Sequence, residues 1–363
     1  MRIAVIEHAE AGDYADYISS LINEKATENN YQLKSWSNSV PAFQQQVASD
    51  AIIYIYIEST SPVLLSWLYN VKIPSILKKT KAQSVIDLNG IASSKIKIPQ
   101  TIIAAEHFFT DDKKQLNSVE KFAAKHLNNS SKIATHIFSY TNKKLNVDAN
   151  ENKVQPILFS APHVFKTYEW HEKLMVKSHH ADNKEFFIAV IEDDNVDDFV
   201  LLLQAFSKFK KWQQSTMQLL VLPKYESLGG AIREKHQTYK YREDVRLIEA
   251  IEESKIAAIF ASAYALIHVA TNKPHLLVLS IAMQCSLPII SFKHEDVNEY
   301  ANGVVLLYEE KNAEAIGNAI IRLYKDENLH AQLKEKAQQQ SVFLNREECE
   351  KKLWSLLTDA AHS

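Results

Sequence analysis

The sequence contains very little glycine. Only six of its 363 residues are glycine, whereas an average usage of ~7% would give about 25. Backbone amides approach a phosphate group closely only where no Cβ intervenes. Neither a G-x-G-x-x-G nor a G-x-x-x-x-G-K motif occurs. The two common glycine-rich loops that bind mononucleotides are therefore excluded.

Cysteine and long apolar runs are also scarce. The two cysteines, Cys285 and Cys349, are too few for a disulfide framework and lack the paired spacing of a zinc site. No stretch approaches the ~18 apolar residues that cross a bilayer. Met1-Arg2 leads into a short apolar run that ends at Glu7, which is not a secretory signal. We therefore expect a cytoplasmic protein with no integral membrane segment.

Neither sign of charge is in excess. The chain has 41 Lys and Arg against 44 Asp and Glu, and its formal net charge is -3. Net charge therefore gives no reason to expect binding to nucleic acid or to anionic lipid. With 46% hydrophobic residues, the chain is long enough to form two domains with ordinary cores.

Short apolar runs of strand length alternate with amphipathic stretches of helical length, which predicts βα units and parallel sheets. The strands expected in the first part of the chain are residues 3–6, 51–57, 85–88, 102–104, 136–138 and 157–159. Those expected in the second part are residues 186–191, 219–222, 245–248, 265–269, 287–291 and 304–307. The clearest helices are expected at residues 13–25, 117–127, 313–325, 329–340 and 347–357.

This alternation is interrupted by a polar stretch rich in histidine and lysine. We expect a domain linker at residues 164–184. The histidine pairs in this stretch lack a carboxylate or cysteine at helical spacing that would complete a metal site. The predicted domains are residues 1–163 and 185–342, followed by a C-terminal helix at 343–363. The predicted fold class is α/β, with two doubly wound Rossmann-like domains facing across a cleft.

Several segments of the second half resemble the retaining glycosyltransferases of family 4. "LLLQAFSKF" is similar to the first helix of that family's nucleotide-sugar-binding domain, and "LSIAMQCSLPIISF" to the helix and strand that the family writes E-A-M-A-x-G-x-P-V-I. "NGVVLLYEEKNAEAIGNAIIRLYKDENLHAQL" resembles its closing strand and helices. The resemblance implies the B-type glycosyltransferase fold, with an acceptor-side first domain, a nucleotide-sugar-side second domain and a last helix that crosses back to the first domain.

The resemblance also implies where a donor diphosphate would bind, and the residues there differ from the family's. Family members clamp the diphosphate with an arginine and a lysine, where negative charge builds up on the leaving group. The corresponding positions here are Glu192 and Asp197-Asp198. Two anions would repel a diphosphate by several kcal/mol at an effective dielectric of about 20. Such a clamp is expected to need a bridging metal ion.

Three further positions depart from the family's pattern. The family's two glutamates, one near the donor sugar and one on the ribose hydroxyls, are replaced by Lys273 and Ile281. Asp87, in "VIDLNG", stands where many members have a histidine that contacts the sugar. Asp87 is therefore the catalytic candidate, as a general base toward the acceptor. The alternative is that Asp87 forms a turn before Asn-Gly.

The segment "AVIEDDNVDDF" places five carboxylates at the end of a strand and the start of a helix. Three interpretations stay open. Asp194 or Asn195 can cap the helix, with acidic residues in its first turn. Asp193 and Asp194 can hold Mg²⁺, the one cofactor that the sequence suggests. A phosphorylation receiver would need a phosphate-accepting Asp after a later strand, but "QLLVLPKY" offers Leu-Pro-Lys there.

The loop "HVATNKPH" after a strand is the richest set of hydrogen-bond donors in the second domain. Together with Glu192 and Asp197, its polar residues are the candidates for binding a nucleotide sugar through a phosphate or carboxylate; the alternative is an ordinary polar loop. The candidates in this loop are His268, Thr271, Asn272, Lys273 and His275.

The function that these observations favour is that of a glycosyltransferase-like protein of cell-surface or polysaccharide biosynthesis. If active, it transfers a hexosyl unit from a nucleotide sugar with retention, using Lys273, His268 and Asp87. The loss of both clamp residues and both glutamates supports a second hypothesis, a catalytically silent homologue that binds a protein partner or a glycan. A third is an unrelated two-domain ligand-binding protein. Converging polar groups in a pocket favour an active site, and a large exposed apolar patch favours a partner.

Overall fold

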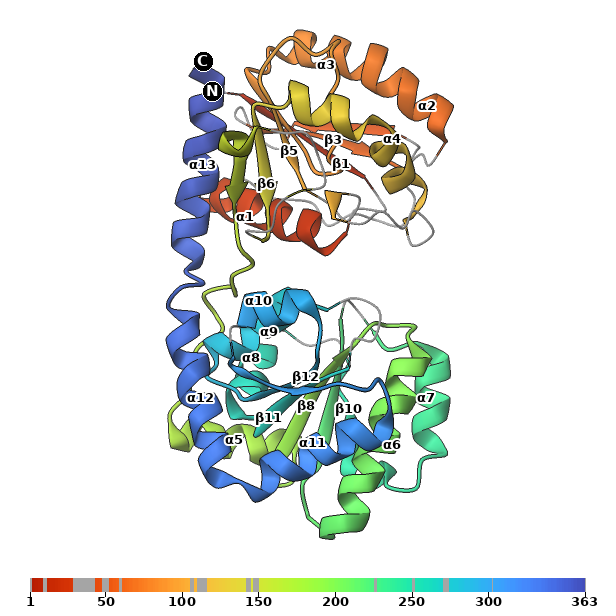
Figure 1. The fold of residues 1–363 in the computed structure, drawn as a ribbon, viewed down its shortest axis with the longest axis vertical. Helices are drawn as coiled ribbons and strands as arrows, with labels where there is room; N and C mark the ends of the chain where they lie inside the picture. The colour runs from red at the N-terminus through yellow and green to blue at the C-terminus, as the bar shows by residue number, and fades with distance from the viewer. Residues whose placement is uncertain are drawn as a thin grey trace. The chain divides into compact units, whose positions relative to one another are not determined.

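The chain folds into two α/β units, each with its own core (Figure 1). The first unit comprises Met1–Phe159 and Glu347–Ser363, and the second comprises Ser160–Arg346. The computed structural model describes residues 2–8, 12–28, 43–47, 52–58, 61–104, 108–109, 116–141, 145, 150–224, 227–249, 252–269, 274–301 and 303–362.

The first unit is built around a seven-stranded sheet. Its strands are β1 (Ile3–His8), β2 (Phe43–Val47), β3 (Ile52–Ile57), β4 (Ser84–Asp87), β5 (Gln100–Ile103), β6 (His136–Ser139) and β7 (Val154–Pro156). They lie in the order β2-β3-β1-β4-β5-β6-β7. All neighbours are parallel except the edge strand β2, which pairs antiparallel with β3. The sequence pattern does not predict β2, because its "FQQQV" lacks the enrichment in β-branched and aromatic residues of a typical strand.

Helices cover both faces of this sheet (Figure 1). They are α1 (Asp13–Glu28), α2 (Pro62–Trp67), α3 (Ile73–Thr80), α4 (Ser118–Ile133) and α13 (Arg346–His362), with the π-helical turn η1 (Leu68–Lys72) and the 3₁₀ turn η3 (Glu151–Lys153). The elements α2, η1 and α3 form one continuous helical run, because the residues between them stay in the right-handed helical region. Leu65, Leu68 and Ile73 on this run pack with Ile6 and Ile55 of the sheet in one core.

The chain leaves the first sheet at β7. The sequence pattern predicts a strand at residues 157–159, and this prediction is wrong. Tyr14 and Tyr17 of α1 donate hydrogen bonds from their hydroxyls to the carbonyls of Ile157 (3.0 Å) and Leu158 (2.8 Å). On α13, Lys352 donates to the Pro156 carbonyl at 2.9 Å. These carbonyls are bonded to side chains of α1 and α13 rather than to a further strand.

The second unit contains a six-stranded parallel sheet. Its strands are β8 (Phe186–Ile191), β9 (Gln218–Pro223), β10 (Val245–Leu247), β11 (Ala265–His268), β12 (Ile289–Phe292) and β13 (Val305–Tyr308). Their order is β10-β9-β8-β11-β12-β13. The chain therefore fills one half of the sheet outward from β8 and then reverses at β11 to fill the other half. Every residue of β8 is buried, as expected for a central parallel strand.

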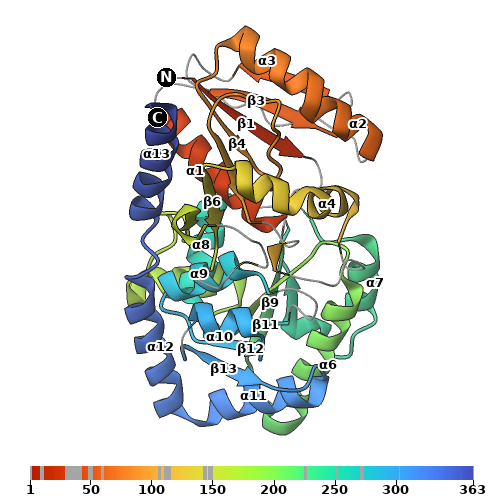
Figure 2. The same ribbon diagram turned by 45° about the horizontal axis from the view of Figure 1, so that its top comes forward.

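Both views of the fold place α8 and α9 on one side of the second sheet and α6 and α11 on the other (Figure 1 and Figure 2). The helical elements of this unit are α5 (Trp170–His180), α6 (Val196–Gln213), α7 (Gly230–Gln237), η4 (Arg242–Asp244), α8 (Glu253–Ser262), α9 (Leu276–Gln284), α10 (Glu295–Ala301), α11 (Ala313–Lys325) and α12 (Glu327–Ser341). Phe206 of α6 and Ile320 of α11 meet in its main core. The helix α5 occupies much of the stretch expected as a linker and packs on α8.

The fold class predicted from the sequence, α/β with two doubly wound sheets, is confirmed. Within the part of the chain that the structure describes, no helix combines the length and apolar character needed to span a bilayer. Cys285 and Cys349 are free thiols.

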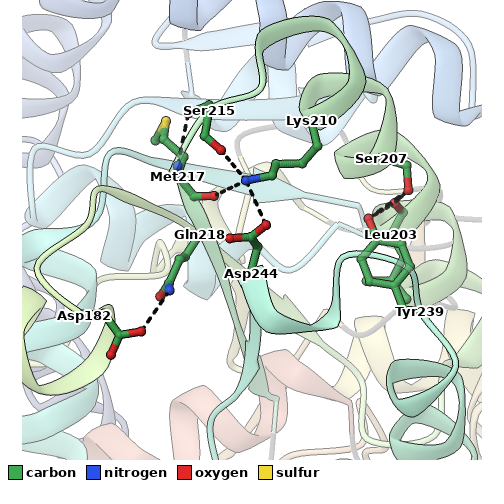
Figure 3. Close-up of polar contacts among 9 residues, drawn as sticks. All are labelled: Asp182, Leu203, Ser207, Lys210, Ser215, Met217, Gln218, Tyr239 and Asp244. Carbon is green, nitrogen blue, oxygen red and sulfur yellow. Dashed lines mark hydrogen bonds and ion pairs between the residues drawn. The ribbon is translucent and has the colours of Figure 1, made fainter.

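One lysine joins three elements at the amino edge of the second sheet (Figure 3). Lys210, near the end of α6, is only 7% exposed. Its ammonium group donates to the carbonyls of Ser215 and Met217 and lies 2.9 Å from the Asp244 carboxylate. Met217 precedes β9 and Asp244 precedes β10. The ammonium group therefore ties the end of α6 to the starts of two strands.

Replacing this lysine is expected to destabilise the second unit. Lys210→Met leaves two carbonyls and a carboxylate without their cation, which costs about 3 kcal/mol of unfolding free energy, or roughly 6–12 °C in thermal midpoint. The exposed neighbour Lys211→Met is the control and should leave the thermal midpoint unchanged. Circular dichroism melts of the native protein and of both variants measure the midpoints. Equal midpoints for both variants would contradict the structural role of Lys210.

Candidate functional site

The carboxyl ends of three neighbouring strands bring polar side chains together in the second unit. Glu192 follows β8, Lys224 follows β9, and His268 is the last residue of β11. His275 stands at the start of α9. This cluster lies where the strand order reverses between β8 and β11. In doubly wound sheets ligands bind at such a reversal, outside the carboxyl ends of the strands.

The Glu192 carboxylate organises the cluster. Its Oε1 accepts from His275 Nε2 at 3.1 Å and from the Lys224 ammonium group at 3.2 Å. The hydrogen bond from His275, together with the charge of Lys224, lowers the pKa of Glu192 to about 2. The carboxylate therefore stays ionised at neutral pH. Because 46% of its side chain is exposed, it meets solvent as well as its two partners.

His268 lies beneath this arrangement and supports it. Its Nε2 accepts from the backbone N–H of His275 at 3.2 Å, so in the neutral ring the proton must sit on Nδ1. Nδ1 lies 2.8 Å from the Ser291 hydroxyl and donates to it. Burial lowers the pKa of His268 to about 3, which keeps the ring neutral. His268 thus fixes the backbone of His275 and carries no charge.

His275 has an unsatisfied ring nitrogen. The residue is buried, and its Nε2–H donates to Glu192. In the described part of the chain, its buried Nδ1 has no hydrogen-bond partner. Buried polar atoms of this kind call for a specific explanation, such as a ligand or an unseen water. His275 also begins α9 without a side-chain hydrogen bond to the helix amides.

The loop after β8 is held by the loop after β9. The Asp193 carbonyl accepts from Gly229 N at 2.7 Å, and the Asp193 carboxylate accepts from Ser227 N at 3.2 Å. A Cβ at Gly229 would lie 2.5 Å from Asp194 Oδ1 and 3.0 Å from the Asp193 carbonyl. Gly229 therefore permits an approach that a larger residue would disturb.

Much of the acidic segment caps α6. The Asn195 side chain accepts from Asp198 N at 3.0 Å and donates to the Asp198 carboxylate at 2.9 Å, so Asn195 is the N-cap. Asp198 is buried and Asp197 is exposed in the first turn, where negative charge favours the helix. Across the described residues, no three His, Cys, Asp or Glu side chains gather to hold a metal ion.

Other predicted site residues lie elsewhere. Thr271, Asn272 and Lys273 fall outside the described residues. In the first unit, Asp87 is buried at the end of β4. It accepts from the Tyr69 hydroxyl at 2.7 Å and from two backbone N–H groups of the following turn at 2.9 and 3.0 Å. Burial raises its pKa to about 6. These contacts are the ones expected if Asp87 stabilises the turn that follows it.

Sequence reasoning missed Lys224. The expectation that the Glu192 carboxylate repels a diphosphate unless a metal bridges them stays a prediction. The structure adds that Lys224 and His275 both contact this negative charge. The available signal was a lysine directly after a strand, at the edge of the sheet where ligands bind.

The comparisons with known proteins bear on this unit directly. Residues 171–340 match the model of the family described as "Glycosyl transferases group 1". This part of the chain is thus similar to the group 1 glycosyltransferases. The switch-point cluster of Glu192, Lys224, His268 and His275 lies within it.

Solved structures share the fold of the whole chain. Sucrose-phosphate synthase from Thermosynechococcus elongatus is 15% identical, with a TM-score of 0.71 over 99% of each chain. WaaG, a glycosyltransferase involved in lipopolysaccharide biosynthesis, is 14% identical, with a TM-score of 0.70 over 98% of this chain and 99% of WaaG. HepE from Anabaena, in complex with UDP, is 11% identical, with a TM-score of 0.71 over 99% of this chain and 100% of HepE. No curated protein matches the sequence. The chain has the B-type glycosyltransferase fold.

The neutral His268 makes the stability of the second unit depend on pH. Between pH 6.5 and about 3 the unfolded chain binds a proton at this histidine and the folded chain does not, so stability falls as pH falls. The advantage of the native protein over His268→Gln should shrink by up to about 1.4 kcal/mol per pH unit below 6.5. Thermal midpoints measured at several pH values test this. The exposed His179→Gln is the control, and equal slopes for all three proteins would contradict a neutral buried His268.

The two adjacent glycines before and in α7 should respond differently to a methyl group. In Gly229→Ala the exposed Asp194 side chain must rotate away and the Asp193 carbonyl must shift by a few tenths of an ångström, which should cost about 1 kcal/mol. Gly230→Ala meets nothing within 4 Å and should be neutral or slightly stabilising. Thermal unfolding of the pair measures the difference. Equal stability would show that the two loops do not depend on this close approach.

Proposed function

We propose that the chain transfers a hexosyl unit from a nucleotide sugar, with the donor bound at the switch-point cluster of the domain that is similar to the group 1 glycosyltransferases. One observation carries the proposal: within that domain, Glu192 holds the Lys224 ammonium group and the His275 imidazole side by side at the carboxyl edge of the sheet. HepE, which shares the fold, binds UDP. The context of cell-surface or polysaccharide biosynthesis is supported by the likeness to WaaG.

The chemistry of the proposed reaction needs positive charge and hydrogen-bond donors at the leaving diphosphate. The Lys224 ammonium group supplies both. The Nε2–H of His275 is already bonded to Glu192, so the Nδ1 of its neutral ring is an acceptor, which suits a hydroxyl group of the donor rather than its phosphates. The backbone amides at the start of α9 add the positive end of a helix dipole. Glu192 keeps the two side chains beside each other before the donor arrives, so less ordering is needed on binding. This set stands in for the family's arginine and lysine clamp.

The other predicted residues have different parts in the proposal. We assign His268 to positioning His275, because its ring is buried and both ring nitrogens are bonded. We assign Asp87 to its turn, because a general base must reach its substrate and this carboxylate is buried among its own partners. The first unit is proposed to bind the acceptor, as the resemblance implies.

We propose no resident magnesium site, but binding is measured both with and without magnesium. Asp193 and Asp194 are adjacent, but Asp193 accepts from Ser227 N and no third ligand gathers with them within the described residues. Among the described residues this set does not fit a resident metal site. If the diphosphate binds together with its own Mg²⁺, its affinity should be higher with magnesium than without it.

Binding of nucleoside diphosphates tests the proposal directly. A ligand that binds only the native state raises the thermal midpoint as its concentration exceeds the dissociation constant. We expect UDP or another nucleoside diphosphate to raise the midpoint, and Lys224→Met to weaken the affinity about ten-fold or more, because a charge-assisted hydrogen bond to phosphate is lost. Lys211→Met, on the exposed side of α6, should bind like the native protein.

Each measurement is made with and without magnesium, and release of UDP from UDP-sugars is followed in parallel. Turnover that Lys224→Met abolishes supports the transferase. A native protein that binds no nucleoside diphosphate at millimolar concentration contradicts it and favours the catalytically silent scaffold. Equal affinities of Lys224→Met and the native protein would remove Lys224 from the site.

A further inference from the structure

The outer side of the α2–η1–α3 run exposes large apolar side chains. Val63 is 81% exposed, Trp67 is 47% exposed and Val71 is 55% exposed. They follow one another at intervals of four residues, so they share one side of the helical run. The inward side of the same run is already packed on the first sheet through residues such as Leu68. The exposed apolar stripe is therefore additional to what the fold needs.

Positive charge predominates in the segments that carry this stripe and in the neighbouring helix α4. Residues 61–104 and 118–133 contain nine of the chain's 41 Lys and Arg but only two of its 44 Asp and Glu. Both carboxylates are engaged within the fold. Asp87 is buried in its turn, and Glu120 accepts from the Asn117 N–H to cap α4. The net charge of -3 for the whole chain conceals a strongly basic region of the first unit.

The apolar and basic residues meet in a groove between α2 and α4. The groove has a volume of about 830 Å³. Val63, Trp67 and Phe122 supply apolar surface along it, and Lys121 and Lys125 line its α4 side. A second group of lysines, including Lys78 and Lys81, continues along and beyond the end of α3.

We propose that this face of the first unit, the α2/α4 face, binds to the surface of an anionic phospholipid bilayer. A helix that lies on a bilayer places Trp and aliphatic residues among the headgroups and lysines against lipid phosphates. Long lysine side chains can reach these phosphates while their stems cover apolar surface. Binding of this kind needs no membrane-spanning helix, and it does not depend on whether the chain transfers sugars.

The distribution of the charges favours a lipid surface over an acidic protein segment. The lysines come from η1, α3 and the residue after it, α4 and the loop before β5, and none is part of the main apolar stripe. A broad basic field around a single exposed stripe matches a plane of uniform negative charge. A partner helix would need only the part of this charge that borders the groove.

Co-sedimentation of the full chain with vesicles tests the proposal. Vesicles containing phosphatidylglycerol should bind the protein, pure phosphatidylcholine vesicles should bind it weakly, and high salt should release it. Trp67→Ser should lower the partition coefficient about ten-fold. Lys121→Gln with Lys125→Gln should lower it roughly 25-fold, at about five-fold for each charge.

Trp170→Ser is the matched control. Trp170 on α5 of the second unit is 74% exposed but is followed two residues later by Glu172, so its loss should leave vesicle binding unchanged. Thermal unfolding shows that every variant folds, which is expected because all the changed side chains reach solvent. Failure of the native protein to bind anionic vesicles would overturn the proposal. So would binding that Trp67→Ser and the double lysine variant leave intact.

Discussion

The Glu192 carboxylate is the contact on which the account of the second unit depends. It follows the fully buried strand β8, and its half-exposed carboxylate meets solvent on one side and two hydrogen-bond donors on the other. Lys224 and His275 are those donors, and each comes from a different part of the sheet edge. The same contacts that stabilise the anion place a cation and an imidazole beside each other. A residue whose charge would repel a diphosphate thus holds a cation and an imidazole together at the proposed donor site.

The two edges of the second sheet use buried charge in different ways. At the amino edge, Lys210 is enclosed and its ammonium group is bonded to two carbonyls and to Asp244. The ammonium group has its partners within the protein, and its contacts join the end of α6 to the starts of β9 and β10. At the carboxyl edge, Glu192 is half exposed and the neighbouring His275 Nδ1 lacks a partner among the residues described. Within the described residues, the first arrangement is complete in itself, whereas the second leaves the Nδ1 of His275 without a hydrogen-bond partner.

Sequence reasoning recovered the fold because the parallel strands are nearly continuous apolar runs, as in "FFIAVI" of β8. It failed at residues 157–159, where tyrosine hydroxyls take the place of a neighbouring strand, and at β2, whose glutamines give no strand signal. For the site, it placed Glu192 and His275 near a ligand but not near each other. Lys224 and His275 are far apart in the chain, and only the strand order brings both of them to Glu192. Contacts between residues this far apart in the chain cannot be predicted from the local sequence pattern.

The most direct test of the role of Glu192 is the affinity for UDP. It is measured for the native protein, for Glu192→Ala and for Asp197→Ala. Asp197 stands at the other clamp position but is exposed in the first turn of α6, so it serves as the matched loss of a negative charge. If Glu192 organises Lys224 and His275, its loss weakens UDP binding, while Asp197→Ala leaves binding unchanged or slightly tighter. Tighter binding by Glu192→Ala would show that the carboxylate merely repels the diphosphate, and would contradict the account.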